Sequence, residues 1–269
     1  MSGTPFPPMS GRPLAGRRIV VTRRPEQAGG LVARLNELGA TVVELPLIEV
    51  APPLQMAPLD DALRGLAAYH WVLFTSANAV RAVSERMTDL GLGERALTSR
   101  KIASVGPATT RALREFFPGV SVAVEAAKHD AEALLGELQA GAQGLRFLFP
   151  TSDRSRDVLP AGLREAGGEV DVVVAYRTVA PPGLRERIMD SLRNGADLVT
   201  FASPSAVENF VAAATEVIPQ TRAAVIGPVT EHACRAAGIA VSVVAEPPSS
   251  EGLTRAIARH FFPERVPPG

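Results

Sequence analysis

Short runs of apolar residues alternate along the chain with segments in which apolar residues recur every third or fourth position. Residues 18–22 form an apolar run directly after basic residues, as in a buried strand. Residues 27–38 have apolar residues at helical spacing and stop at Gly39, a typical helix end. The same alternation continues to a last helix at 252–260. It predicts right-handed crossovers and doubly wound parallel sheets, the α/β class.

The second half of the chain repeats the first. Three short motifs return in the same order about 120–130 residues later, a spacing far longer than a solenoid repeat. The repeated pairs are 74–80 (FTSANAV) with 201–207 (FASPSAV), 105–109 (VGPAT) with 226–230 (IGPVT), and 35–39 (LNELG) with 163–167 (LREAG). This duplicated unit predicts two similar domains with a cleft between them, where small-molecule sites are common.

Two predicted strands are unusually long. Residues 41–50 and residues 169–179 occupy matching places in the two copies, and an Ala-Pro-Pro sequence follows each of them. About ten extended residues span more than 30 Å. Each strand is therefore long enough to run from one domain into the other.

The composition excludes several classes of protein. Among 269 residues, 28 basic side chains balance 28 acidic ones, without the basic excess of a nucleic-acid-binding protein. No apolar stretch reaches the roughly 18 residues of a membrane-spanning helix. The Pro- and Gly-rich residues 1–16 favour a disordered leader over a signal peptide, and the single Cys234 can form neither an internal disulfide nor a zinc site. We expect a cytoplasmic monomer that binds neither nucleic acid nor membrane.

Small polar residues follow the predicted strands, at the edge where open α/β sheets bind ligands. Hydroxyl groups at helix starts and Gly-Pro turns offer free backbone N–H groups to carboxylate or phosphate. These loop residues include Thr75, Ser76, Gly106, Thr151, Ser152, Ser203, Gly227, Ser249 and Ser250. Ordinary helix capping explains the same residues, so both interpretations stay open. No loop matches a dinucleotide or P-loop motif.

Basic residues join the same ends of the predicted strands. Arg23 and Arg24 follow the first strand, and Arg154 and Arg156 follow its counterpart in the second copy. Their shared position favours capture of an anion over a solvated surface pair.

Tyr176 is a candidate for chemistry because it lies late in the second long strand. A phenol keeps its proton at neutral pH and can donate it to a leaving hydroxyl group. From position alone, a strand tyrosine packed at an interface is the simpler interpretation. The four histidines lack partners at metal-ligand spacing, and no Ser-His-Asp order or pair of acids is visible. The sequence thus argues against metal, acyl-transfer and glycosidase chemistry.

Five motifs in order give the chain a specific resemblance. They are 75–80 (TSANAV), 105–109 (VGPAT), 174–179 (VAYRTV), 201–207 (FASPSAV) and 226–230 (IGPVT). Together they resemble the uroporphyrinogen-III synthase family over residues 17–260. The resemblance implies two α/β domains joined by a two-stranded linker. Because the family's first strand and helix belong with its C-terminal half, the domains would be residues 17–47 plus 181–269 and residues 48–180.

The resemblance also implies an activity. The family converts hydroxymethylbilane, a linear tetrapyrrole with eight carboxylates, into uroporphyrinogen III by removing its hydroxyl as water, inverting ring D and closing the macrocycle. It uses no metal and no cofactor. Tyr176 matches the family tyrosine thought to assist departure of the hydroxyl. The positions that match the family's cleft are Thr75, Ser76, Gly106, Thr109, Ser203, Ser205, Gly227 and Thr230. Arg23 and Arg154 complete the predicted substrate-binding set.

Two other functions fit the same scaffold. A sensor would bind a tetrapyrrole or another anion without converting it, but nothing in the chain resembles a DNA-binding module, and residues 261–269 are too few for a winged helix. A solute-binding protein would be expected to carry a signal peptide and aromatic clamps, and neither is visible. The cyclising enzyme is therefore the favoured hypothesis, and the non-catalytic sensor is its alternative.

Overall fold

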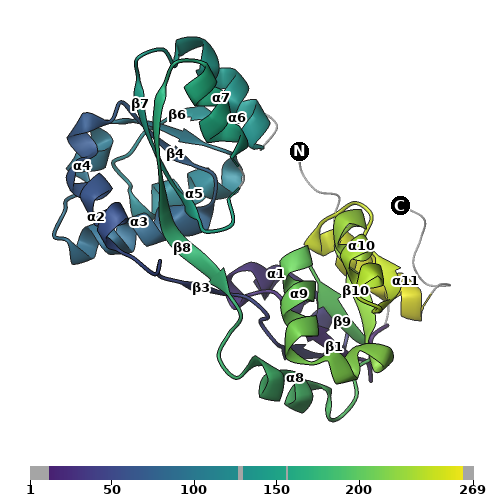
Figure 1. Cartoon of the computed structure of the whole chain (residues 1–269). Coiled ribbons are helices and arrows are strands. Elements are labelled where there is room, and N and C mark those ends of the chain that lie inside the picture. The colour runs from purple at the N-terminus through teal and green to yellow at the C-terminus, as the bar shows by residue number, and fades with distance from the viewer. Residues whose placement is uncertain (1–11, 127–129, 156, 263–269) are drawn as a thin grey trace. The chain divides into compact units, whose positions relative to one another are not determined.

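The computed structural model describes residues 12–126, 130–155 and 157–262. The chain divides into two compact units. Unit 1 combines the residues up to Glu49 with those from Val179 onward, and unit 2 is Val50–Thr178. Each unit has a sheet covered by helices on both faces (Figure 1). Unit 2 is thus one continuous piece of chain, whereas unit 1 is assembled from two pieces.

Unit 1 is built on a five-stranded parallel sheet of order β2-β1-β9-β10-β11. Its strands are β1 (Arg18–Val21), β2 (Thr41–Glu44), β9 (Leu198–Phe201), β10 (Arg222–Val225) and β11 (Ala240–Val244). Ile19 of β1 pairs with Leu198 of β9. Two strands of the first sequence copy therefore complete the sheet of the second copy.

Unit 2 has the reciprocal arrangement. Its strands are β4 (Trp71–Phe74), β5 (Lys101–Ser104), β6 (Val122–Glu125), β7 (Arg146–Ser152) and β8 (Glu169–Val179), with β3 (Glu49–Ala51) at the edge. The order is β3-β8-β7-β4-β5-β6, and the strands from β4 to β8 pair in parallel. Here β7 and β8 occupy the places that β1 and β2 occupy in unit 1. The predicted pair of similar parallel α/β sheets is confirmed.

The helices repeat the same plan. They are α1 (Pro25–Glu37), α2 (Ala57–Arg64), α3 (Ala77–Asp89), α4 (Arg95–Thr98), α5 (Pro107–Phe116), α6 (Ala131–Leu138), α7 (Val158–Glu165), α8 (Leu184–Leu192), α9 (Pro204–Ala213), α10 (Pro228–Ala236) and α11 (Ser250–Phe261). In unit 2, α3 packs beside α5 and α6 packs beside α7. In unit 1, α9 packs beside α10 and α1 packs beside α11.

Alternation along the strands gives each sheet two cores. In β4, Phe74 packs into the cluster that contains α2, α3 and α5, whereas Leu73 packs into the cluster of α6 and α7. In β9, Phe201 packs toward α8, α9 and α10, whereas Leu198 packs toward α1 and α11. Strands buried on both faces need apolar residues at successive positions. This is why the strands appear as unbroken apolar runs in the sequence.

The predicted long strand 41–50 is wrong. The segment forms two strands in different sheets, because β2 ends at Glu44 in unit 1 and β3 lies beside β8. Pro46 separates them and has no N–H to donate to a ladder. On either side of it, Leu45 and Leu47 are buried in the core of unit 1.

The second predicted long strand is confirmed. It is β8, which is continuous over eleven residues. The two-stranded linker and the domain limits 17–47 plus 181–269 and 48–180 stay predictions.

The predicted disordered leader 1–16 is also too long. Residues 1–11 lie outside the described part, but the segment from Arg12 to Gly16 belongs to unit 1. Leu14 is fully buried in the core with α1 and α11, and its N–H donates to the Leu38 carbonyl at 2.9 Å. A single apolar side chain among Pro and Gly residues was too weak a pattern to predict this packing.

Candidate functional site

Both sheets have a topological switch point, where the order of the strands along the chain reverses, at the equivalent position. The reversal lies between β1 and β9 in unit 1 and between β7 and β4 in unit 2. In open α/β sheets, ligands bind outside the carboxyl ends of the strands at such a point. We call the loops there the carboxyl edges. They comprise residues 22–24, 202–203, 226–227 and 245–249 in unit 1, and residues 75–76, 105–106 and 153–155 in unit 2.

The structure brings Tyr176 and Ser76 together at the carboxyl edge of unit 2. Ser76 follows β4 and caps α3 by accepting the N–H of Ala79 at 3.1 Å. The phenol oxygen of Tyr176 lies 3.1 Å from the Ser76 hydroxyl oxygen. Tyr176 is only 8% exposed and packs into the core that contains α3. Apolar packing thus fixes the ring, while the phenol oxygen keeps a polar neighbour.

An irregularity between β7 and β8 places Tyr176 at this edge. The strands pair regularly as far as Thr151 and Val174, and then the register shifts so that Ser152 faces Tyr176. The tyrosine carbonyl accepts the N–H of Asp153 at 3.3 Å. The side chain of Tyr176 is therefore aimed by a local break in the ladder, which the sequence pattern does not reveal.

The other predicted residues of unit 2 differ in exposure. Thr75 is half-buried beside Ser76, and Gly106 begins α5. Thr109, one turn into α5, is almost fully buried. Arg154 is exposed after β7, and its backbone N–H donates to the Ser152 hydroxyl at 3.3 Å. Arg156, the other arginine predicted there, lies outside the described residues.

Unit 1 presents a similar set of groups. Ser203 caps α9 by accepting the N–H of Ala206 at 3.3 Å, and its hydroxyl oxygen lies 3.1 Å from that of Ser205. Gly227 begins α10, and Thr230 in the first turn of that helix is only 3% exposed. The hydroxyls of the two serines are therefore partly accessible to a ligand, whereas the side chain of Thr230 is buried within unit 1.

Arg23 joins two loops of the unit 1 edge. Its guanidinium donates from Nη1 to the Ser250 hydroxyl at 3.1 Å, next to Ser249, which caps α11. Burial, followed by the neighbouring charge of Arg24, lowers the pKa of Arg23. The sequence pointed to both loops but not to their contact, because Arg23 and Ser250 lie at opposite ends of the chain.

Sequence reasoning missed a chain of polar groups at the same end of unit 2. Thr110 in α5 donates a hydrogen bond to the Glu125 carboxylate at the end of β6. The Thr110 hydroxyl oxygen also lies 2.7 Å from that of Ser104 at the end of β5. Ser104 and Thr110 are buried and Glu125 is exposed. The sequence feature that could have predicted this contact is the polar residue at the end of each apolar run, Ser104 after 102–103 and Glu125 after 122–124.

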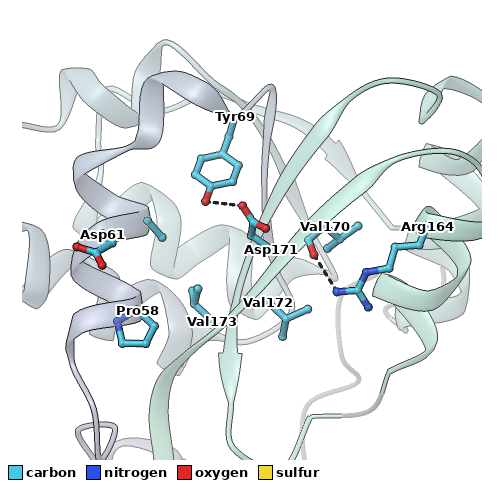
Figure 2. A pocket seen from close by; sticks show the side chains of 9 residues that line it. Pro58, Asp61, Tyr69, Arg164, Val170, Asp171, Val172 and Val173 are labelled. Atoms are coloured by element: carbon cyan, nitrogen blue, oxygen red, sulfur yellow. Dashed lines mark hydrogen bonds between the residues drawn. The ribbon is translucent and has the colours of Figure 1, made fainter.

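A pocket of about 510 Å³ lies elsewhere in unit 2 (Figure 2). It is lined by Pro58, Asp61, Ala62, Tyr69, Arg164, Val170, Asp171, Val172 and Val173, so it contains none of the predicted site residues. Tyr69 donates to the Asp171 carboxylate at 2.8 Å, and burial followed by this bond raises the pKa of Tyr69 to about 12. Asp171 also pairs with Arg146 at 3.1 Å. These groups neutralise one another rather than present a free charge.

The described residues contain neither a cluster of metal-binding side chains nor a membrane-spanning helix. Among residues 12–126, 130–155 and 157–262, no three His, Cys, Asp or Glu side chains gather as a metal site requires. Within the same part of the chain, no helix combines the length and apolar character needed to span a bilayer.

The sheets and their edges define a class of protein. Each unit is a doubly wound α/β domain whose carboxyl edge presents hydroxyl groups and helix N-termini, the groups that hold small anionic ligands.

Comparison with known proteins makes the assignment specific. The profile of a family described as uroporphyrinogen-III synthase HemD matches residues 30–255. The chain is 30% identical over 266 residues to the uroporphyrinogen-III synthase of Synechococcus elongatus, covering 93% of this chain and 97% of that protein. It is 28% identical over 249 residues to that of Chlorobaculum parvum, covering 90% and 98%. The chain belongs to the uroporphyrinogen-III synthase family, and the resemblance found in the sequence is confirmed.

A solved structure supports the fold independently. A mutant uroporphyrinogen III synthase from the extremely thermophilic bacterium Thermus thermophilus matches with a TM-score of 0.63 at 22% identity, covering 93% of this chain and 100% of that chain. At this identity the match bears on the fold alone.

Proposed function

We propose that the chain converts hydroxymethylbilane into uroporphyrinogen III, with loss of water and inversion of ring D. The observation that carries the proposal is the contact between the Tyr176 phenol and the Ser76 hydroxyl at the carboxyl edge of unit 2, in a chain of this family. A weak acid held beside anion-binding loops is what the reaction requires, because the pyrrole itself supplies most of the driving force.

Departure of the hydroxyl needs one proton. A pyrrole nitrogen lone pair expels the hydroxymethyl oxygen as the C–O bond breaks, and the Tyr176 phenol gives its proton to that oxygen. Water leaves, and an azafulvene cation and a phenolate remain. Closure with inversion then forms two C–C bonds to ring D, breaks the C–C bond that joined ring D to its neighbouring bridge carbon, and releases one proton, which the phenolate takes back. The tyrosine thus ends the cycle unchanged.

Substrate binding requires many donors for eight carboxylates. The backbone N–H groups at the starts of α3, α5, α9 and α10 provide them without a dense cluster of positive charge. We assign substrate binding to Thr75, Ser76, Gly106, Thr109, Arg23, Arg154, Ser203, Ser205, Gly227 and Thr230. Closure without inversion is the competing route, so these contacts must hold ring D in one pose.

The decisive experiment is incubation of the chain with hydroxymethylbilane, followed by chromatographic separation of the type I and type III products. We expect the type III isomer to dominate. A protein that bound the substrate but left the spontaneous isomer ratio unchanged would be the non-catalytic sensor, and the proposal would be wrong.

Tyr176→Phe tests the proposed acid. We expect kcat to fall about 10²-fold, the lower end of the range for general acid catalysis, because the pyrrole nitrogen assists the departure. Circular dichroism should show that the fold survives. An unchanged rate of type III formation would remove Tyr176 from the mechanism.

We further propose that the enzyme is a cytoplasmic monomer that uses no metal or cofactor and binds neither nucleic acid nor membrane. Gel filtration with light scattering checks the monomer, since a dimer would elute with twice the mass of 28.3 kDa.

A further inference from the structure

The Ser76 hydroxyl has a limited set of hydrogen-bonding roles. A serine hydroxyl offers one proton and two acceptor lone pairs. The N–H of Ala79 already occupies one lone pair, because Ser76 caps α3. The 3.1 Å contact with Tyr176 must therefore use either the remaining lone pair or the serine proton.

The two choices have different consequences for the tyrosine. If Tyr176 donates to Ser76, its proton is engaged and cannot pass to a leaving hydroxyl. If Ser76 donates to the phenol oxygen, the phenol proton is free. After that proton has been transferred, the phenolate can only accept hydrogen bonds, and the Ser76 hydroxyl is a donor already in contact with it.

The helix cap strengthens the second choice. The Ala79 N–H, the Ser76 hydroxyl and the Tyr176 oxygen form a chain in which each donation polarises the next bond. The chain starts at the N-terminus of α3, where the helix carries partial positive charge. Tyr176 is nearly buried, so weak solvent screening makes this polarisation more effective.

We propose that Ser76 is a positioning residue for the reaction: it donates to the Tyr176 oxygen, leaves the phenol proton free for the departing hydroxyl, and stabilises the phenolate that forms. This role deepens the proposed function and rests on it. In unit 1 the corresponding cap, Ser203, contacts the Ser205 hydroxyl instead, so no equivalent contact with a tyrosine is made there.

A double-mutant cycle tests the coupling. We expect Ser76→Ala to lower kcat for type III formation about tenfold, the effect of one hydrogen bond of about 1.4 kcal/mol to a charged transition state. In a Tyr176→Phe background, Ser76→Ala should lower kcat much less, because the group it serves is gone. Equal losses in the two backgrounds would show that Ser76 acts independently of the tyrosine and would overturn the inference.

Two further variants separate the hydroxyl from the helix cap. Ser76→Thr keeps a hydroxyl and a cap, so kcat should recover to within a few-fold of wild type; a threonine enzyme as slow as the alanine enzyme would count against the role. Asp130→Ala is the control, because Asp130 caps α6 in the same unit by accepting the N–H of Ala133 at 2.7 Å. Its urea unfolding midpoint should fall by about as much as that of Ser76→Ala, while kcat is unchanged.

The two outcomes below distinguish failure of the role of Ser76 from failure of the proposed cyclising activity. If wild-type protein forms no type III excess, the proposed function itself is wrong. If wild type forms the type III isomer but the cycle shows no coupling, only the role of Ser76 is wrong.

Discussion

Apart from the extra edge strand β3 of unit 2, unit 1 and unit 2 have the same strand order and matching serine-capped helices, yet the group beside the capping serine differs. In unit 2 the Ser76 hydroxyl lies beside the phenol of Tyr176, and in unit 1 the Ser203 hydroxyl lies beside the hydroxyl of Ser205. Duplication thus supplies a hydroxyl-capped edge twice, while a phenol lies beside one of the two caps. Binding groups can be inherited by copying a fold, but the chemical group has to be added to one copy.

The backbones at the matching Gly-Pro turns differ as well. Gly106 has φ 139°, a conformation open essentially to glycine, whereas Gly227 has φ 172°, extended backbone that any residue can adopt. The backbone therefore requires glycine at position 106 but not at position 227.

The largest expected effect concerns Cys234, the single thiol of the chain and a probe of unit 1. It is fully buried in α10, and burial raises its pKa to about 12. Because the thiolate is the reactive form, we expect labelling by a thiol reagent to be at least about 10³-fold slower in native protein than in urea. The labelling rate is measured with a disulfide reagent that releases a coloured thiol when it reacts with Cys234. Native labelling at the unfolded rate would mean that unit 1 opens freely.

A smaller effect is expected from truncating equivalent core residues. Phe201→Ala should lower the free energy of unfolding by about 3–5 kcal/mol. Part of this loss is the edge-to-face contact with Phe210, whose ring centroid lies 5.4 Å from that of Phe201. Phe74→Ala makes the matching change in unit 2. Urea unfolding followed by Cys234 labelling and by the fluorescence of Trp71, the single tryptophan, reports the two units separately.

The paired readouts make the comparison testable. Each unit has its own core clusters, so Phe201→Ala should shift mainly the Cys234 transition and Phe74→Ala mainly the Trp71 transition. Coincident shifts in both variants would show that the two units unfold as one.

Alanine at the two turn glycines should separate their roles. Gly106→Ala forces a side chain into a glycine-only conformation and should cost about 1–3 kcal/mol of stability. At Gly227 an added Cβ would lie 3.4 Å from Pro248, an ordinary contact, so Gly227→Ala should stay within about 1 kcal/mol of wild type. Chemical denaturation measures both. Equal costs would contradict the distinction drawn from the φ angles.

The smallest expected effect is the alkaline response of Tyr69. Its pKa is raised to about 12 when folded, so its contribution to stability is complete below pH 10 and is lost between about pH 10 and 12. We expect this loss to be about 1 kcal/mol, because its half-exposed partner Asp171 is screened by solvent. Tyr69→Phe should lack it, and parallel pH curves of stability would refute the linkage.

Much of the fold could be predicted because local and global preferences agree. The helices α1 and α11 coincide within two residues with the segments 27–38 and 252–260 that apolar spacing predicts, and the Gly-Pro turns begin α5 and α10 as expected. Strands buried on both faces gave unbroken apolar runs. The break at Pro46 was missed because apolar residues continue across it, although proline lacks the N–H that a ladder needs.

The sequence predicts candidate site residues but not the contacts between them. Ser76 is predicted from its place at a helix start, and Tyr176 from its place late in the second long strand and from the family resemblance. Their contact depends on the register shift between β7 and β8, which no periodicity encodes. The contact of Arg23 with Ser250 depends on tertiary structure in the same way.

The discontinuity of unit 1 has a consequence for synthesis on the ribosome. Unit 2 is contiguous and can complete its sheet once residue 178 has emerged, while β1 must wait for β9, its hydrogen-bonded neighbour, with Ile19 opposite Leu198. During that interval β1, α1 and β2 are tethered to a finished neighbour with their apolar faces uncovered, a state prone to aggregation. Synthesis of β9 therefore allows β1 to pair and its apolar faces to be covered. Slow translation of the segment that contains β9 would lengthen the time for which those faces are exposed.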